Sequence, residues 1–198
     1  LICHPIAHMP RISKVYRGDR YLVIIEEYIE ESSLSEYLKK GIFRPTEAVH
    51  IVRNLCCILN ELHTLECPII HRDIKPSNVM LTKSGEVVLL DMNVAKWYDS
   101  EEKEDTRLLG TKDYAAPEQA GYGMKASSDK TDIYAVGILL NVMLTGKLPK
   151  EKPAQGKLWD IIERCIPLDA DTRYSADELI ERLDNYLGEN TNAGKKDR

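Results

Sequence analysis

Short apolar runs separated by turn residues open the chain and return near its middle. Residues 12–16 and 21–25 are rich in β-branched and aromatic side chains, and the Arg-Gly-Asp-Arg sequence between them predicts a tight turn. Residues 79–81 and 87–90 repeat this pattern around Thr-Lys-Ser-Gly. The pattern therefore predicts two small antiparallel hairpins.

Between the hairpins, apolar residues spaced three and four apart indicate helices. A short helix is expected between a serine cap, Ser32 or Ser33, and Gly41, because serine favours the start of a helix and glycine its end. A long amphipathic helix follows, with Thr46 as its cap and Pro68 as its terminator.

The second half of the chain is also predicted to be helical. Residues 131–144 are apolar on nearly every face, which is typical of a helix at the centre of a domain. Apolar spacing predicts another helix over residues 158–165 and a last one from a Ser175 cap to Leu187. Residues 188–198 are polar and predict a flexible tail. The fold class is α+β, with a mostly helical body.

Composition narrows the possible partners. The net charge is −5, which argues against a general nucleic-acid binder because such modules are usually basic. The longest apolar run, residues 133–144, is shorter than the roughly 20 residues of a membrane span. The five cysteines show no paired metal spacing, and no secretory leader opens the chain. We expect reduced thiols and a cytoplasmic location.

Three short motifs follow one another in a fixed order. Residues 71–78 read His-Arg-Asp-Ile-Lys-Pro-Ser-Asn, the strand at residues 87–90 ends in Asp91, and residues 116–118 read Ala-Pro-Glu. Together they resemble the catalytic loop, the metal-binding aspartate and the end of the activation segment of a eukaryotic-type protein kinase. The resemblance covers residues 1–187, and it implies a protein-kinase-like fold with most of its small lobe absent.

The resemblance assigns the chemistry to the motif residues. Asp73 would accept the proton of the substrate hydroxyl, and Lys75 would place an ammonium group near the transferred phosphoryl group. A lysine there points to serine or threonine as the acceptor. Asn78 and Asp91 would offer oxygen ligands to Mg²⁺. ATP is the implied phosphoryl donor.

The same resemblance places the nucleotide. Met80 would lie under the adenine ring, while the backbone of Glu27 and Ile29 would bind the adenine edge. Glu26 falls at the position that guards the back of the pocket, and Asp91 completes the site. Taken alone, a methionine on a strand is simply a core residue.

Several residues would support the site without touching ATP. Thr111 would bond to Asp73 or Lys75, and Glu118 would form a buried pair with Arg173. Two further positions support the catalytic loop: His71, which opens it, and Asp132, which would accept hydrogen bonds from its backbone. Asp132 also suits the N-terminus of a helix.

Arg72 suggests control by phosphorylation. An arginine directly before the catalytic aspartate is found in kinases that are switched by a phosphate on the activation loop, which it can bind through bidentate hydrogen bonds. Residues 98–106 are polar and acidic and predict an exposed loop. Thr106 is the best acceptor in it. The alternative is that Arg72 bonds only loop carbonyls and that Thr106 is an ordinary exposed threonine.

The chain departs from the family pattern at three places. Residues 91–93 read Asp-Met-Asn instead of Asp-Phe-Gly, and Asn93 is expected to take the positive φ of the missing glycine. No glycine-rich loop or strand lysine is present. The short connection at residues 146–155 looks more like bacterial than animal kinases. We divide the chain into a small-lobe remnant with the hinge (residues 1–31), a C-terminal lobe (32–187) and a tail (188–198).

These observations predict an N-terminally truncated protein serine/threonine kinase whose partner is a protein with a serine or threonine acceptor. Two other functions are open. A pseudokinase-like scaffold or binding module would explain the missing glycine-rich loop and lysine. A small-molecule phosphotransferase would share the Asp…Asn…Asp order, but it is not expected to carry the residues 110–119 together with Arg173.

Overall fold

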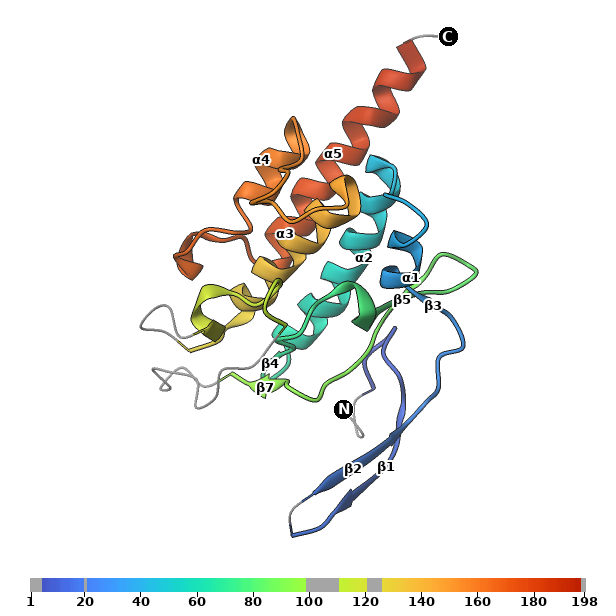
Figure 1. Ribbon diagram of the computed structural model, residues 1–198, viewed down its shortest axis with the longest axis vertical. Coiled ribbons are helices and arrows are strands. Elements are labelled where there is room, and N and C mark those ends of the chain that lie inside the picture. The colour runs from blue at the N-terminus through green and yellow to red at the C-terminus, as the bar shows by residue number, and fades with distance from the viewer. Residues whose placement is uncertain (1–4, 20, 99–110, 121–125, 197–198) are drawn as a thin grey trace.

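The computed structural model describes residues 5–19, 21–98, 111–120 and 126–196, and the side chains of these residues up to 190. Helices form one body, and a two-stranded ribbon lies apart from them on one side (Figure 1). Among the described residues, no helix combines the length and the apolar character needed to cross a bilayer.

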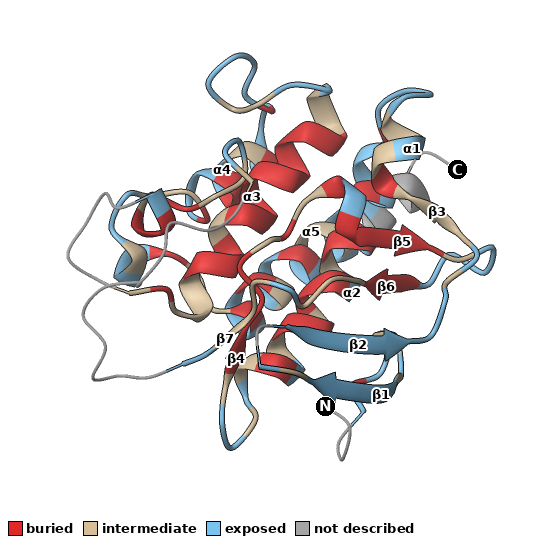
Figure 2. Cartoon of the chain, turned by 60° about the horizontal axis from the view of Figure 1, so that its bottom comes forward, coloured by how far each residue is buried: buried red, intermediate tan, exposed pale blue. Residues whose placement is uncertain are grey.

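The ribbon is the first predicted hairpin. Strand β1 (Ile12–Arg17) pairs antiparallel with β2 (Leu22–Glu26), and Arg17 lies opposite Leu22 next to the turn. All of β2 and nearly all of β1 are exposed, as the pale blue strands in Figure 2 show. The ribbon therefore adds little to the core.

The second predicted hairpin lies inside the body. Strand β5 (Val79–Leu81) pairs with β6 (Val87–Leu89), and every residue of both strands is buried. The short strand β3 (Ser32–Ser33) pairs with the other edge of β5. A separate pair, β4 (Ile69–Ile70) with β7 (Lys96–Trp97), joins the chain before the catalytic motif to the chain after Asp91.

The two helices before the catalytic motif differ from prediction only at their ends. Helix α1 (Leu34–Leu38) begins after Ser33, whose backbone N–H donates to the Glu36 carboxylate at 3.0 Å. Helix α2 (Pro45–His63) has Arg44 as its N-cap, so the predicted Thr46 cap is wrong by two residues. Proline suits the first helical position, because its missing N–H would have no partner there.

Helices α3 (Asp129–Thr145), α4 (Lys157–Glu163) and α5 (Ala176–Lys196) follow. Most of α3 is buried, so the predicted central helix is confirmed. Helix α5 continues to Lys196, so the change to irregular structure predicted at Gly188 does not occur there. Helix α2 packs on both α3 and α5, and side chains from all three helices contribute to the core (Figure 1).

One buried polar side chain in α3 shapes the short connection that follows it. The Asn141 Nδ2 group donates to the carbonyls of Lys147 at 2.8 Å and Lys152 at 3.0 Å, while its Oδ1 accepts from Ala154 N–H at 2.8 Å. A single amide thus satisfies backbone groups on both sides of the turn. The chain reverses toward α4 without an additional helix.

Candidate active site

The catalytic motif, residues 71–78, forms a loop over residues 71–75 after β4 and ends in the short 3₁₀ helix η1 (Pro76–Asn78). Its centre is anchored by Ile74, which is completely buried. Arg72 has a φ of +69°, a conformation that a side chain with a Cβ rarely adopts. The loop is therefore held in its shape by its surroundings rather than by local preference.

Asp73 is the centre of a dense hydrogen-bond network. Its Oδ2 accepts from the Lys75 ammonium at 2.6 Å, and its Oδ1 accepts from the Thr111 hydroxyl at 2.8 Å. Lys75 also donates to Thr111 at 3.0 Å. The predicted contact of Thr111 is thus present with both partners, although Thr111 lies 38 residues after Asp73 in the chain.

Asn78 closes the network from the other side. Its Nδ2 group donates to the backbone carbonyl of Asp73 at 2.9 Å and to the carboxylate at 3.1 Å. Partial burial alone would raise the pKa of Asp73, but the hydrogen bonds from Lys75, Thr111 and Asn78 lower it below its usual value. The carboxylate is therefore ionised and oriented at neutral pH.

His71 connects this loop to the end of β6. The imidazole is fully buried, and its Nε2 lies 3.0 Å from the Leu90 carbonyl, to which only a protonated nitrogen can donate. Its Nδ1 accepts from the Asp73 backbone N–H at 3.3 Å. Burial lowers the pKa of His71, so the ring is neutral with its proton on Nε2.

The carboxylate of Asp132, in the first turn of α3, accepts from the loop backbone, as predicted. Its Oδ1 accepts from Arg72 N–H at 2.7 Å and its Oδ2 from His71 N–H at 2.9 Å. A third donor comes from α2, where the His63 Nε2 lies 2.9 Å from Oδ2. Burial raises the pKa of Asp132, but these hydrogen bonds outweigh burial and lower it overall.

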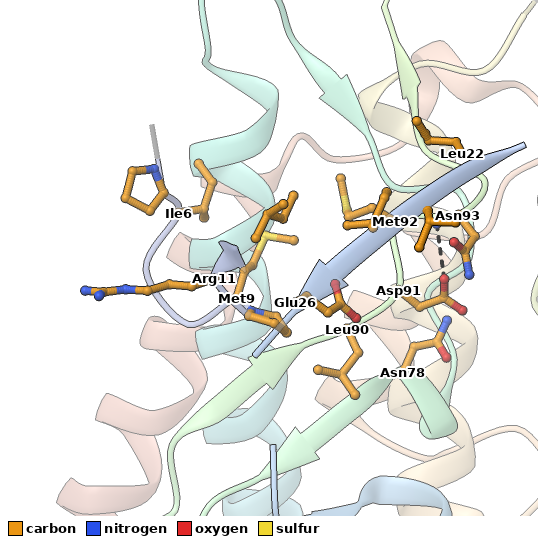
Figure 3. Close-up of a pocket in the computed structure, with 15 residues that line it drawn as sticks. Ile6, Met9, Arg11, Leu22, Glu26, Asn78, Leu90, Asp91, Met92 and Asn93 are labelled. Atoms are coloured by element: carbon orange, nitrogen blue, oxygen red, sulfur yellow. Dashed lines mark hydrogen bonds between the residues drawn. The ribbon is translucent and has the colours of Figure 1, made fainter. Parts of the chain in front are cut away.

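A cavity of about 800 Å³ lies between the ribbon, the first described residues and the chain after β6. Asn78, Asp91 and Asn93 line one end of it, and Glu26 and Leu22 line it from β2 (Figure 3). Concave sites of this size commonly take small molecules. Both predicted metal ligands therefore line one cavity, and Asn78 connects that cavity to the hydrogen-bond network around Asp73.

The oxygen atoms at this end of the cavity suit Mg²⁺, which prefers carboxylate and amide oxygens. The Nδ2 group of Asn78 is directed to Asp73, which leaves its Oδ1 as an acceptor toward other groups. Asp91 has a φ of +69° and its Oδ1 accepts from the Asn93 N–H at 3.1 Å. The positive φ thus falls on Asp91, and the prediction that Asn93 would carry it is wrong.

The three other predicted ATP contacts do not line this cavity. Glu27 closes the open end of the ribbon, where its N–H donates to the Arg11 carbonyl at 2.9 Å. Met80 is buried on β5 between its partners on β3 and β6, and Ile29 is partly exposed in the chain that follows β2. Their roles remain predictions. Glu26, in contrast, lines the cavity.

The predicted pair of Glu118 and Arg173 is present and bidentate, with N···O distances of 2.8 and 3.0 Å. Both side chains are almost completely buried, and the Arg173 guanidinium lies over the Tyr134 ring at 4.9 Å. Glu118 lies in the 3₁₀ helix η2 (Pro117–Ala120). Next to it, the Gln119 amide donates to the Arg72 carbonyl at 2.7 Å, which ties η2 to the catalytic loop.

Thr106 and most of the predicted loop at residues 98–106 lie outside the described residues, so the structure does not test the phosphorylation hypothesis.

The arrangement of these motifs agrees with comparison to known proteins. A sequence profile described as "Protein kinase domain" matches residues 4–183. The chain belongs to the protein kinase family. The predicted fold class and the family resemblance are thereby confirmed.

Individual kinases similar to this chain come from several organisms. The serine/threonine-protein kinase PrkC of Bacillus subtilis is 34% identical over 145 residues, which cover 71% of this chain and 22% of PrkC. The serine/threonine-protein kinase A of Synechocystis is 30% identical over 172 residues (80% and 33%), and the mitogen-activated protein kinase kinase 1 of Arabidopsis thaliana is 30% identical over 191 residues (80% and 52%). The chain thus spans a third or less of the two bacterial kinases and about half of the plant kinase.

Sequence reasoning missed two residues of this kinase site. His63 bonds to Asp132, 69 residues further along the chain, and Gln119 bonds to the catalytic loop at the Arg72 carbonyl, 47 residues before it. The signal for His63 was its place in the last turn of an amphipathic helix, just before the catalytic motif. Gln119 directly follows the Ala-Pro-Glu motif and carries no signal of its own.

Proposed function

We propose that this kinase chain transfers the γ-phosphoryl group of ATP to serine or threonine hydroxyls of proteins. The observation that carries the proposal is the triangle of Asp73, Lys75 and Thr111, whose side-chain atoms lie 2.6 to 3.0 Å apart. An ionised carboxylate next to an ammonium group can accept the acceptor's hydroxyl proton while positive charge faces the transferred group. The kinases to which the chain is similar are named for the same activity.

The residues divide the chemistry among them. Asp73 orients the acceptor hydroxyl and receives its proton as the oxygen bonds to phosphorus. Lys75 stabilises the negative charge of the transferred group, and Thr111 helps to seat the acceptor. Asn78 and Asp91 would hold Mg²⁺, which neutralises phosphate charge when it is bound. The lowered pKa of Asp73 is compatible with this role, because phosphoryl transfer depends more on positioning and charge than on a strong base.

We place the kinase in the cytoplasm, where ATP is abundant. The free cysteines among the described residues support this location, because Cys56, Cys57, Cys67 and Cys165 form no disulfide.

Substitution of Asp73 tests the proposed activity. In the full-length gene product, Asp73→Asn keeps the shape of the side chain but removes the proton acceptor, so turnover should fall by about 10²–10⁴-fold. Phosphorylation of a generic protein substrate with labelled ATP measures it. Asp160→Asn, an exposed position on α4, is the matched control and should leave turnover unchanged.

A lack of phosphoryl transfer by the unsubstituted protein would favour the scaffold function. A protein that uses this lobe only as a binding module should show no transfer above background before substitution, and Asp73→Asn should leave partner binding unchanged. Equal turnover of the Asp73→Asn variant and the unsubstituted protein would contradict the catalytic role of Asp73.

We also propose that phosphorylation of Thr106 activates the kinase through Arg72. A phosphate on Thr106 would be repelled by the acidic sequence at residues 101–105 and attracted to a guanidinium group. Mass spectrometry after incubation with MgATP should find phosphate on Thr106, and Thr106→Ala should be less active. An unmodified Thr106 together with a fully active alanine variant would contradict the switch but not the kinase assignment.

A further inference from the structure

Two exposed connections form a basic face at one end of the helical body. One connection joins α1 to α2, and the other joins α3 to α4. The basic face consists of six exposed cations: Lys39, Lys40, Arg44, Lys147, Lys150 and Lys152. The chain as a whole has a net charge of −5, so this concentration of positive charge runs against its composition.

The fold brings the two connections together. The Phe43 N–H donates to the Met143 carbonyl at 2.9 Å, and a Cβ atom added at Gly146 would lie 3.4 Å from Ile42 Cγ2. The start of α2 and the end of α3 lie at the same end of the helical body (Figure 1). Cations that are far apart in the sequence therefore belong to one surface.

The connection between α3 and α4 has a fixed shape. The buried Asn141 side chain donates to the carbonyls of Lys147 and Lys152 and accepts from the Ala154 N–H. On the connection, these contacts use backbone atoms only, and the two lysine side chains are exposed. A partner that binds the lysines therefore does not have to order the loop first, which lowers the entropy cost of binding.

The cations of the basic face have no counter-ions within the described part of the chain. None of the six forms an ion pair there, whereas the neighbouring Lys157 pairs with Glu189. Two acids, Glu47 and Glu151, lie close in the sequence and offset only part of the positive charge. The remaining charge is available to a partner.

Ile42 adds an apolar contact to the basic face. Its side chain is 60% exposed and lies against Gly146, where the two connections meet. An apolar side chain among cations is complementary to a peptide that carries carboxylates. An anionic bilayer is a poorer match, because the rest of the chain has an excess of acidic residues that a wide anionic surface would repel.

We propose that the basic face binds an acidic segment of the protein that this kinase phosphorylates. The identity of the partner rests on the proposed kinase function, but the binding itself can be measured without phosphoryl transfer. The competing interpretation is that these lysines are an ordinary solvated surface, since most lysines in proteins are exposed.

The place of the basic face predicts where the acidic segment lies in the substrate. Asp132, which holds the catalytic loop, is in the first turn of α3, and Gly146 follows the last turn. A rise of about 1.5 Å per helical residue separates these two positions by about 20 Å. An extended peptide spans about 3.3 Å per residue, so the acidic segment should lie at least about six residues from the acceptor.

Binding can be tested on the 198-residue chain by fluorescence anisotropy, with a labelled glutamate-rich peptide and a matched peptide that has glutamine in the same places. Lys147→Glu combined with Lys150→Glu should weaken binding of the glutamate peptide by about tenfold or more, because attraction becomes repulsion at two positions. Lys14→Glu combined with Lys83→Glu is the matched control, since both positions are exposed and the net charge changes equally. The control should bind as the unsubstituted chain does.

Three results would overturn the proposal. The first is equal affinity of the two double variants, and the second is equal affinity of the two peptides for the unsubstituted chain. The third is binding to phosphatidylserine vesicles, abolished by the Lys147 and Lys150 substitutions, without any binding of the glutamate peptide. If that double variant fails to fold, the amide NMR spectrum of the unsubstituted chain decides. Shifts at residues 39–44 and 146–152 on addition of the glutamate peptide would support the proposal, and shifts only elsewhere would overturn it.

The role in substrate selection is tested in the full-length gene product. Acceptor peptides that carry the acidic segment on either side, at least about six residues from the serine, are compared with their glutamine counterparts. At least one acidic peptide should have a KM lower by about tenfold with little change in kcat, because the contact is the same before and during transfer. Lys147→Glu combined with Lys150→Glu should remove the difference. Equal KM values throughout would overturn this role. If the unsubstituted protein transfers no phosphate, the proposed function fails, while the anisotropy experiment still decides whether the basic face binds acidic segments.

Discussion

At the scale of single residues, the neutral His71 ring is the most sensitive part of the site. Its bond to the Leu90 carbonyl requires a proton on Nε2, and its bond from the Asp73 N–H requires a bare Nδ1. A second proton on the ring would break the contact with Asp73 and leave a charge in the core. Acidification should therefore disturb the catalytic loop before it disturbs the helices.

The neutral His71 ring makes the stability of the fold depend on pH. Burial lowers the pKa of His71 below its ordinary value of 6.5, so the unfolded chain takes up this proton first. The contribution of His71 is complete above pH 6.5 and is lost as the pH falls through the lower, folded-state pKa, by up to about 1.4 kcal/mol per pH unit.

Urea unfolding at several pH values between about 7.5 and 5.5 measures the effect, within the range where histidine titrates. His71→Gln should show a flatter pH dependence in this window, even if it is less stable throughout. Asp73 and Asp132 do not contribute there, because their pKa values are lowered from 3.8 and they titrate in stronger acid. An identical pH dependence of the variant and the unsubstituted chain would contradict the neutral buried ring.

At the scale of elements, two helical glycines predict opposite effects of the same substitution. A Cβ atom added at Gly137 in α3 would lie 2.6 Å from Cys165 Cβ and 2.9 Å from Ile166 Cγ2, which is an overlap. A Cβ atom at Gly188 in α5 would meet nothing within 4 Å. Gly137 therefore permits close packing of α3 on the chain that directly follows α4, whereas Gly188 only weakens its helix.

Gly137→Ala should lower the free energy of unfolding by about 1–3 kcal/mol through overpacking. Gly188→Ala should raise it by up to about 1 kcal/mol, the difference between glycine and alanine within a helix. Chemical denaturation of both variants measures the two effects against the unsubstituted chain. If Gly188→Ala changes neither stability nor helix content, residue 188 lies in a tail, as the sequence pattern predicted.

The elements that could be predicted from sequence have strong local signals. Both hairpins combine β-branched runs with turn residues, and α3 is apolar all round. Strands β3, β4 and β7 were missed because two residues cannot show a period, and their pairing depends on distant partners. The continuation of α5 was missed because the polar residues after Leu187 carry no apolar stripe.

Some residues of the candidate site could likewise be predicted from local sequence patterns, and others could not. Asp73, Asn78 and Asp91 could be named as candidates because they belong to short motifs with fixed spacing, and the structure brings Asn78 and Asp91 to one cavity. Local patterns cannot show which distant side chain completes a buried carboxylate. That is why His63 was missed, while the position of Asp132 was found through a resemblance to a family.

At the scale of the whole molecule, the ribbon of β1 and β2 is exposed to solvent. Large apolar side chains are exposed on both of its strands, including Tyr16 at 50% on β1 and Leu22 at 59% and Ile25 at 45% on β2. Figure 2 shows both strands in the colour of exposed residues. A two-stranded ribbon has unpaired edges that can add a strand from another chain. Contiguous apolar surface of this kind promotes association.

We therefore expect the 198-residue chain to self-associate as its concentration rises. Ile25→Lys should shift sedimentation velocity toward the 22.6 kDa monomer, because a charge on an exposed strand opposes pairing. Leu168→Lys is the matched control, since Leu168 is 82% exposed but lies away from the ribbon, and it should have no such effect. Equal association of both variants would place the contact elsewhere.

Ion pairs between residues far apart in the sequence close the lobe, and they limit how early the lobe can fold during synthesis. Glu118 and Arg173 are 55 residues apart, and Arg53 reaches Asp184 across 131. While the chain is still being synthesised, a ribosome-bound form that ends before Arg173 cannot pair the Glu118 carboxylate with its cation. In the same form, the face of α2 that packs on α5 is open to water. Completion of the lobe must therefore wait for α5 to leave the ribosome. Until then the nascent chain is a natural client for a chaperone.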